Sequence, residues 1–532
     1  MRLAKHEEKS VDKLHYIHSR GGRIGDGETS SPADIDAILA ALRADGRKHL
    51  VLHFHGGLVA KASGLAIAER LSPAYAEAGY PVFYVWETGA WEAIRNNLGE
   101  LADEPIFKQL VRKLLEYALQ RLGAQGGTRS ILPGNVDPGE VKQTVDRFWQ
   151  APSQSTIPYR GIDPTASPFV ARSASTQVDE AEIQADLEQD AEFAAALATL
   201  PDLPPGTRSA LAAPGAREHR SAFSLAIADQ VSEVPGSRGL ITWFKVALLV
   251  KNILVNLLRR YADGRDHGLY ATVVEEIVRE VKLGGSGLNE WGKALQWNRM
   301  KQDALDAFSG DADMHAGSAL LARLKSAIDD GLKLERISLI GHSTGAIYIA
   351  HWLDSAQRVL PHGLKFDVIF LAPAITYDLF DRTVAAHSER IGNFRMFCMQ
   401  DALERDDQVW GDETDSPEAG DLRRFIYPSS LLYLVSGILE SHVDEEGVSL
   451  DEPDMPLLGM ERFLTLDKVY DAERFPAVGR VRAWLRAAPN RLVWSRAEGG
   501  PAGLNSASID HGAFDDDAAT VASLKSILKA GW

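Results

Sequence analysis

Cysteine is nearly absent from this chain of 532 residues, which contains only Cys398. A single thiol cannot form an internal disulfide, and the Cys-x-x-Cys spacing of zinc and redox motifs is missing. One cysteine is typical of a reducing compartment. The N-terminal 22 residues are polar and lack the apolar segment of a secretory signal. We therefore expect a cytoplasmic protein.

Positive charges are outnumbered by negative ones, and long apolar runs are scarce. The formal net charge is -17, so the long-range field repels nucleic acid, and we expect no nucleic-acid partner. The most apolar stretch, 240–258, is interrupted by two lysines and two asparagines, which argues against a membrane-spanning helix. An amphipathic helix that covers a pocket or lies at an interface fits this stretch better.

The order of apolar runs predicts parallel strands joined by helices. Residues 49–55 and 80–86 form two such runs around a helical stretch, 60–78, which indicates a parallel pair with a crossover. Strand-like patterning resumes late in the chain and ends before a helix with an acidic start. These later segments are 335–340, 366–371, 394–399, 491–494 and the helix 518–528.

The middle of the chain has a different pattern. Helical segments there surround residues 123–217, which are rich in Pro, Gly, Ser, Ala and acidic residues and predict loops or partial disorder. The chain is also longer than one core needs. We therefore expect an α/β domain built from 1–95 and 333–532, with a mainly helical insertion or cap, 96–332, whose middle is partly disordered.

One motif carries chemistry directly. Gly341-His342-Ser343-Thr344-Gly345 follows a predicted strand and precedes a helical stretch, 346–353. In Gly-x-Ser-x-Gly the serine sits at a sharp turn, and the glycines let strand and helix pass without a Cβ clash. Such a serine needs a base, an acid that orients the base, and N–H groups for the oxyanion. The context favours Ser343 as a nucleophile over an ordinary glycine-rich turn.

A second motif, His55-Gly56-Gly57, follows the strand 49–55. With these two motifs the chain resembles the α/β-hydrolase family, particularly its lipase and esterase branch, over about 50–95 and 335–532. The resemblance implies a mostly parallel sheet flanked by helices and hydrolysis of carboxylic esters without a cofactor. It also implies an oxyanion hole from the amides of Gly57 and Thr344, with Leu58 as a further candidate. A plain turn is the alternative for the two glycines.

In this family the acid and then the base follow the nucleophile along the chain. The resemblance therefore favours His511, between the last strand and the final helix, over His442, which follows a segment, 430–440, that fits either a strand or a helix. The acid is expected just after the strand 394–399. Asp401 lies nearest to the end of that strand, and the same loop offers three alternatives, Glu404, Asp406 and Asp407.

His53 and His55 form a His-x-His pair on one strand. This spacing points both imidazoles to the same face and could begin a metal site. No Asp-His follows and a metal needs a third ligand, so we expect no metal and a core position for His53.

The expected function is hydrolysis of a small-molecule or lipid ester by Ser343, His511 and Asp401. Amidase, thioesterase or acyltransferase chemistry on the same triad is an alternative, as is a hydrolase-like binding protein without catalysis; the complete triad argues against the latter. The apolar residues of 240–258 suggest a lid that contacts an acyl chain or a membrane surface, with an ordinary buried cap helix as the alternative.

Overall fold

The computed structural model describes residues 11–56, 60–87, 90–123, 137–161, 165, 176–200, 221–231, 242–283, 297–410, 417–418, 420–440, 442–443, 449–450 and 453–532. The chain forms two compact units. Unit 1 comprises Met1–Trp91, Trp297–Glu404 and Pro456–Trp532, and unit 2 comprises Glu92–Gln296 and Arg405–Met455. The sequence predicted that 297–332 belongs to the insertion and 405–455 to the α/β part. In the structure, 297–332 belongs to unit 1 and 405–455 belongs to unit 2.

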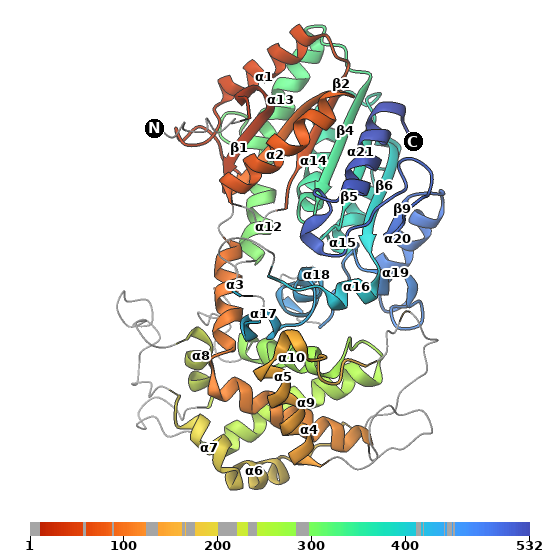
Figure 1. Ribbon diagram of the computed structural model, residues 1–532. Coiled ribbons are helices and arrows are strands. Elements are labelled where there is room, and N and C mark those ends of the chain that lie inside the picture. Colours follow the sequence, from red (N-terminus) through yellow and green to blue (C-terminus); the bar gives the residue numbers. More distant parts are fainter. Residues whose placement is uncertain are drawn as a thin grey trace, which may run out of the picture. The chain divides into compact units, whose positions relative to one another are not determined.

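Unit 1 is an α/β unit with one parallel sheet of seven strands in the order β1-β3-β2-β4-β5-β6-β9 (Figure 1). Each apolar run expected as a strand forms one, and the polar edge strand β1 joins them. The bounds are β1 Tyr16–Arg20, β2 His49–Phe54, β3 Tyr80–Glu87, β4 Arg336–His342, β5 Phe366–Leu371, β6 Ile391–Met399 and β9 Leu492–Ser495.

Helices cover both faces of this sheet (Figure 1). The longer ones are α1 Pro32–Asp45, α2 Lys61–Ala76, α12 Trp297–Asp306, α13 Ala316–Asp329, α14 Gly345–Val359, α20 Pro476–Arg486 and α21 Ala518–Ala530. The short ones are α15 Tyr377–Phe380, α16 Asp401–Asp406, α19 Glu461–Thr465 and the 3-10 turn His511–Ala513; α16 crosses the unit boundary.

Alternation along the strands divides the core into two layers. On one face, strand residues such as Val51, Ile340 and Ile369 pack with Leu71 of α2 and Leu524 of α21. The opposite face of β2 and β3 carries aromatic rings that stack on α14. Because successive side chains in a strand point to opposite faces, buried strands need apolar residues at nearly every position, which explains their continuous apolar runs.

The chain reverses its direction of winding between β2 and β4. These two strands are neighbours, but the connection from β2 goes outward to β3, while β4 continues through β5 and β6 toward β9. In parallel sheets a crevice opens outside the carboxyl ends of strands at such a reversal, and ligands commonly bind there. The carboxyl ends at this reversal are the segments that follow Phe54 and His342.

Unit 2 is mainly helical. Its helices are α3 Ala90–Leu101, α4 Pro105–Gly123, α5 Pro138–Gln150, α6 Glu180–Gln189, α7 Ala191–Leu197, α8 Ala222–Val231, α9 Trp243–Ala262, α10 Leu269–Leu283, α17 Leu422–Phe425 and α18 Leu431–Leu434, where α18 continues as a π-turn, Val435–Leu439. A two-stranded ladder of β7 His442–Val443 and β8 Ser449–Leu450 completes the described elements. The segment 430–440 forms a helix rather than a strand. The Ser430 side chain caps this helix by accepting a hydrogen bond from the amide of Tyr433.

The expectation of loops or disorder over 123–217 is wrong for a large part of that stretch. Helices α5, α6 and α7 lie within it, while 124–136, 162–164, 166–175 and 201–220 lie outside the described residues. The apolar residues of α5 recur at helical spacing and are buried: Val141, Val145, Phe148 and Trp149. Aspartates cap all three helices, so acidic content that suggests disorder serves here as helix starts.

The expected helix over 240–258 is observed as α9, with 240–241 outside the described residues. Most of its apolar residues are buried in unit 2, whereas Phe244 is 58% and Leu248 is 37% exposed. These two lie one turn apart on the same face. Among the described helices, none has the length and apolar character to cross a membrane.

Candidate active site

Ser343 occupies a strained turn between β4 and α14. Its φ of 53° lies in the left-handed region, which residues other than glycine seldom adopt. The turn is pinned to the end of β5, because the Ser343 amide donates to the carbonyl of Leu371 at 2.8 Å and its carbonyl accepts from Ala374 at 3.0 Å. Strain of this kind persists only where the surroundings impose it, and it is concentrated at functional sites.

The two glycines of the motif are required by space. A Cβ on Gly345 would lie 2.1 Å from the carbonyl oxygen of Phe54, and a Cβ on Gly341 would lie 2.8 Å from the Gly345 carbonyl carbon. Both contacts are with backbone, which cannot rotate away. The pattern thus allows α14 to pass directly over the ends of β2 and β4.

His511 meets the serine hydroxyl. Its turn follows β9 and precedes α21, and its Nε2 lies 2.9 Å from the Ser343 Oγ. Both side chains are buried, with residue exposures of 6% and 5%. This distance lies within hydrogen-bond reach of a nucleophile and its base. The structure therefore brings together Ser343 and His511, two of the three residues expected from the sequence.

His511 is held in its neutral form. Burial lowers the pKa of its imidazole, and the charge of His342 lowers it further, to about 3. A neutral imidazole can accept the serine proton at Nε2, which is the state that a general base requires.

The residue before the nucleophile contacts the same turn that carries the base. His342 Nε2 lies 2.9 Å from the carbonyl oxygen of His511, and His342 Nδ1 lies 3.6 Å from Oδ2 of Asp515. Of the three aspartates at the acidic start of the final helix, Asp517 caps it, since its side chain accepts from the Thr520 amide. Asp515 instead is buried beside His342.

Asp401, the predicted acid, lies at the start of α16. Asp401 begins α16 directly after β6, is 1% exposed, and its amide donates to Oε2 of Glu461 at 2.7 Å. Of the alternatives, Glu404 is buried, and Asp406 is exposed and pairs with Arg160. The identity of the carboxylate that orients His511 stays a prediction. The side chain of His442, the alternative base, lies outside the described part of the chain, so the preference for His511 over His442 also stays a prediction.

The oxyanion hole is described in part. Thr344 is fully buried at the start of α14, immediately after Ser343. Gly57 and Leu58 lie outside the described residues. Gly56 passes close to the nucleophile, because a Cβ built on it would be 3.5 Å from the Cβ of Ser343. The segment after β2 thus approaches the serine, and the donor role of Gly57 stays a prediction.

The His-x-His pair of β2 has protein partners. Nδ1 of His53 lies 3.1 Å from the hydroxyl of Tyr75, and the ring packs in the core as expected. Nε2 of His55 accepts from the Trp86 amide at 3.2 Å, and its Nδ1 lies 2.6 Å from the Gly56 carbonyl. Within the described residues, no group of three or more His, Cys, Asp or Glu is placed to hold a metal ion.

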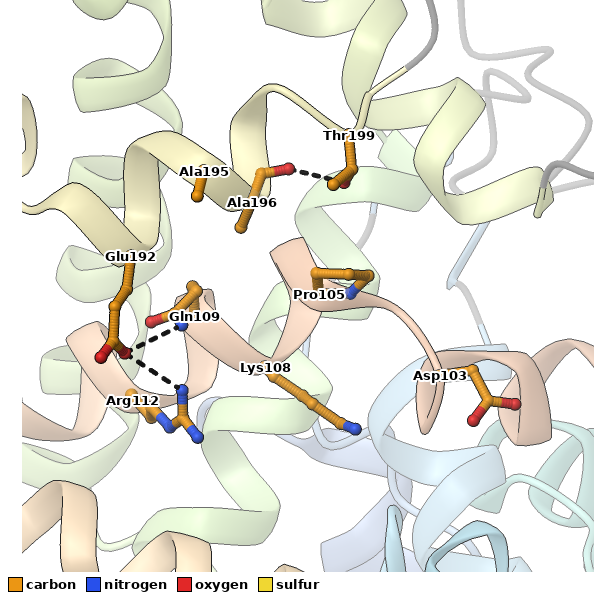
Figure 2. A pocket seen from close by; sticks show the side chains of 9 residues that line it. All are labelled: Asp103, Pro105, Lys108, Gln109, Arg112, Glu192, Ala195, Ala196 and Thr199. Atoms are coloured by element: carbon orange, nitrogen blue, oxygen red, sulfur yellow. Dashed lines mark hydrogen bonds and ion pairs between the residues drawn. The ribbon is translucent and has the colours of Figure 1, made fainter.

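A surface hollow occurs in unit 2, built only from residues of that unit. Its volume is about 440 Å³, and it lies between α4 and α7. Figure 2 shows Gln109 and Arg112 pointing toward Glu192 across it, at 3.5 and 3.8 Å. Because Glu192 also pairs with Lys142, the charges of this hollow are largely matched with one another.

A buried polar cluster in unit 2 also contains serine, histidine and glutamate. His267 Nε2 lies 2.9 Å from Glu275 Oε1, and Ser429 Oγ lies 3.4 Å from His267 Nδ1. Glu275 also pairs with Arg260 at 2.6 Å and accepts from the Tyr427 hydroxyl at 2.5 Å. These contacts neutralise a fully buried carboxylate, and the serine lies at the limit of hydrogen-bond distance. We interpret the cluster as structural.

Geometry thus places Ser343 at the elbow in contact with His511, and it adds His342 and Asp515, which sequence patterns did not reveal. Sequence patterns give only a weak signal for this pair. One member is a histidine inside Gly-x-Ser-x-Gly, the other is an acid four residues after His511, and about 170 residues separate them. A scan against protein-family models and searches of curated proteins and of solved structures find no match to this chain.

Proposed function

We propose that this chain is a serine hydrolase that cleaves carboxylic esters through an acyl-serine intermediate. The observation that carries the proposal is the hydrogen bond of 2.9 Å between Ser343 Oγ and His511 Nε2, made at a strained strand-to-helix elbow. A serine hydroxyl is a weak nucleophile until a base takes its proton, and His511 is neutral and within reach.

In the proposed reaction Ser343 Oγ attacks the ester carbonyl carbon while its proton moves to His511 Nε2. The tetrahedral oxyanion is held by the amides of Thr344 and Gly57. His511 then returns the proton to the departing alkoxide, which leaves as an alcohol. Water repeats the sequence on the acyl-serine, and the carboxylic acid is released. Asp401 remains our candidate for the acid that orients His511.

The arrangement of unit 1 supports membership of the α/β-hydrolase fold. The elbow follows a central strand at the point where the sheet reverses its winding, and nucleophile, candidate acid and base follow β4, β6 and β9 in chain order. Many chemistries use this fold, so amide, thioester and acyl-transfer reactions on the same residues are the alternative enzymatic proposals.

A direct test combines a fluorophosphonate probe with hydrolysis of short p-nitrophenyl esters. We expect the probe to label Ser343, and Ser343→Ala to abolish labelling and reduce kcat/KM by about three or more orders of magnitude. Circular dichroism would verify that the variant is folded. An unlabelled wild-type protein without ester turnover would favour the hydrolase-like binding protein.

The base is tested with a matched pair of histidine variants. His511→Ala should be about as damaging as loss of the serine, because the members of a triad act as a unit. His442→Ala should retain most of the wild-type activity, because His511 is the histidine in contact with the Ser343 hydroxyl. The reverse ranking would transfer the role of base to His442.

A further inference from the structure

One turn holds the imidazole of His342 at both of its nitrogens. The carbonyl of His511 contacts Nε2 at 2.9 Å, and the carboxylate of Asp515, four residues later, faces Nδ1 at 3.6 Å. His342 is part of the elbow, directly before Ser343. The contacts therefore connect the strand that presents the nucleophile with the turn that presents the base.

These two contacts determine the protonation of His342. The peptide carbonyl is an acceptor only, so Nε2 must carry a hydrogen, and a carboxylate 3.6 Å from Nδ1 favours a hydrogen there too, which would make the ring a cation. All three groups are buried, and Oδ2 of Asp515 has no hydrogen bond within normal length among the described residues. A buried carboxylate is costly without a nearby positive charge, and His342 supplies one.

We infer that His342 and Asp515 form a positioning pair, a buried cation and anion that hold the turn of His511 against Ser343; this inference rests on the hydrolase function proposed above. Geometry assigns the pair two effects. It fixes the distance between base and nucleophile through the His511 carbonyl, and it places a positive charge near His511, with ring centroids 5.7 Å apart.

The pKa directions agree with this assignment. Burial alone would lower the pKa of His342, but the charge and contact of Asp515 and the His511 carbonyl outweigh it and raise the pKa above its usual value. Burial would raise the pKa of Asp515, but His342, aided by Arg70, lowers it to about 2. Both directions favour the charged forms of the pair.

Other titratable groups face the pair from β2, from α2 and from the turn itself: His53, His55, Arg70, Tyr75 and Asp516. Arg70 lies 3.4 Å from Asp515 but is 41% exposed in its side chain and also pairs with Asp516 at 2.8 Å. Burial lowers the pKa values of His53 and His55 to about 3 and 4, so both are neutral and do not replace His342 as the cation.

The test uses two conservative variants and a neighbouring control. Asp515→Asn keeps the shape but removes the anion, and His342→Gln keeps a donor for the His511 carbonyl but removes the cation. Asp516→Asn removes the adjacent carboxylate, which pairs with Arg70 instead. We expect kcat to fall about 10- to 100-fold in the first two variants with little change in KM, as expected when a base is displaced. The control should stay near wild type.

A pH profile separates positioning from general destabilisation. Removing the charge of His342 removes one cause that lowers the pKa of His511, so the acid limb of kcat/KM should move to higher pH in His342→Gln and Asp515→Asn. His342→Ala, which also loses the donor, should be slower than His342→Gln. The inference would be overturned if Asp515→Asn and Asp516→Asn had equal rates and neither moved the acid limb of kcat/KM.

A measurement independent of activity keeps this inference distinct from the proposed function. In protein labelled with ¹³C at histidine, the His342 signal, assigned with His342→Gln, should report an imidazolium at pH 7 in the wild type. A neutral His342 would overturn the pair even in an active enzyme and even where Asp515→Asn fails to fold. Absence of probe labelling in the wild type, with a charged His342, would instead contradict the hydrolase proposal alone.

Discussion

At the scale of single residues, the candidate site gathers groups whose environments set opposite protonation states. His342 and His511 are both buried, yet their pKa values shift in opposite directions: burial and then the charge of His342 lower that of His511, whereas Asp515 outweighs burial and raises that of His342. Groups driven apart in this way can be assigned separate tasks in acid and base chemistry. Here the neutral ring is the one that contacts Ser343.

The lowered pKa of His511 predicts an unusual acid limit of activity. An ordinary histidine is mostly protonated below pH 6.5 and fails as a base, whereas a pKa of about 3 leaves His511 neutral well below that value. The acid limb of kcat/KM should therefore lie below pH 6.5, with substantial ester turnover at pH 5.

The stability of the folded protein responds to acid in the opposite way to activity. The unfolded chain takes up this proton more readily than the folded one, so the His511 contribution to stability is lost as pH falls below 6.5. Circular dichroism at each pH is the control for loss of folded protein. An acid limb at or above pH 6.5 in folded protein would contradict the assignment of His511 as a desolvated neutral base.

The sequence, with the family resemblance, predicted Ser343 and His511 as partners, and the structure places the two in contact, whereas the sequence did not single out Asp515. Ser343 stands between two glycines whose spacing has a steric cause, and His511 lies between the last strand and the final helix. Asp515 stands in a run of three aspartates before a helix, where capping is the common role. Only the fold shows that Asp517 is the cap and that Asp515 faces His342.

At the scale of elements, the elbow allows a test of whether steric limits explain the glycines of the motif. Gly345→Ala would place a methyl group 2.1 Å from the Phe54 carbonyl oxygen, so β2 and α14 must separate. We expect a loss of about 1 to 3 kcal/mol in the free energy of unfolding, measured with urea, and slower labelling of Ser343. Gly363→Ala is the matched control, because a Cβ there meets nothing within 4 Å. Equal stability of the two variants would show that the elbow accommodates a methyl group at position 345.

Helix α9 offers a comparison between its two faces. Leu254 is fully buried and Leu248 is 37% exposed, although both belong to one apolar helix. Leu254→Asp buries a charge without a partner and should unfold unit 2 or lower its thermal midpoint strongly, whereas Leu248→Asp should leave the midpoint near that of wild type.

The same substitution tests the lid hypothesis. As a lid residue, Leu248 would contact the acyl chain, so Leu248→Asp should reduce turnover of long-chain esters and spare short-chain esters. Equal effects on both substrates would leave α9 as an ordinary core helix with two exposed apolar residues, Phe244 and Leu248.

At the scale of the whole molecule, the sequence predicted the strands well and the grouping of segments poorly. Strands such as β5 are continuous apolar runs because both of their faces are covered, so their local pattern is sufficient. Which unit a helix joins depends on partners far along the chain, and no local pattern reports this. Residues 405–455 accordingly lie in unit 2, although they sit between two strands of unit 1.

This interrupted organisation leads to a prediction for unfolding. Each unit has its own buried core and is assembled from separate segments, so the chain should depart from two-state behaviour. Scanning calorimetry should resolve two transitions, with a calorimetric enthalpy larger than the van't Hoff enthalpy. Ile369→Ala and Ile277→Ala each remove a fully buried side chain, from unit 1 and unit 2 respectively, at a cost of about 2 to 5 kcal/mol. Each variant should lower the midpoint of a different transition, whereas one shared transition that both variants shift equally would show that the units unfold as one.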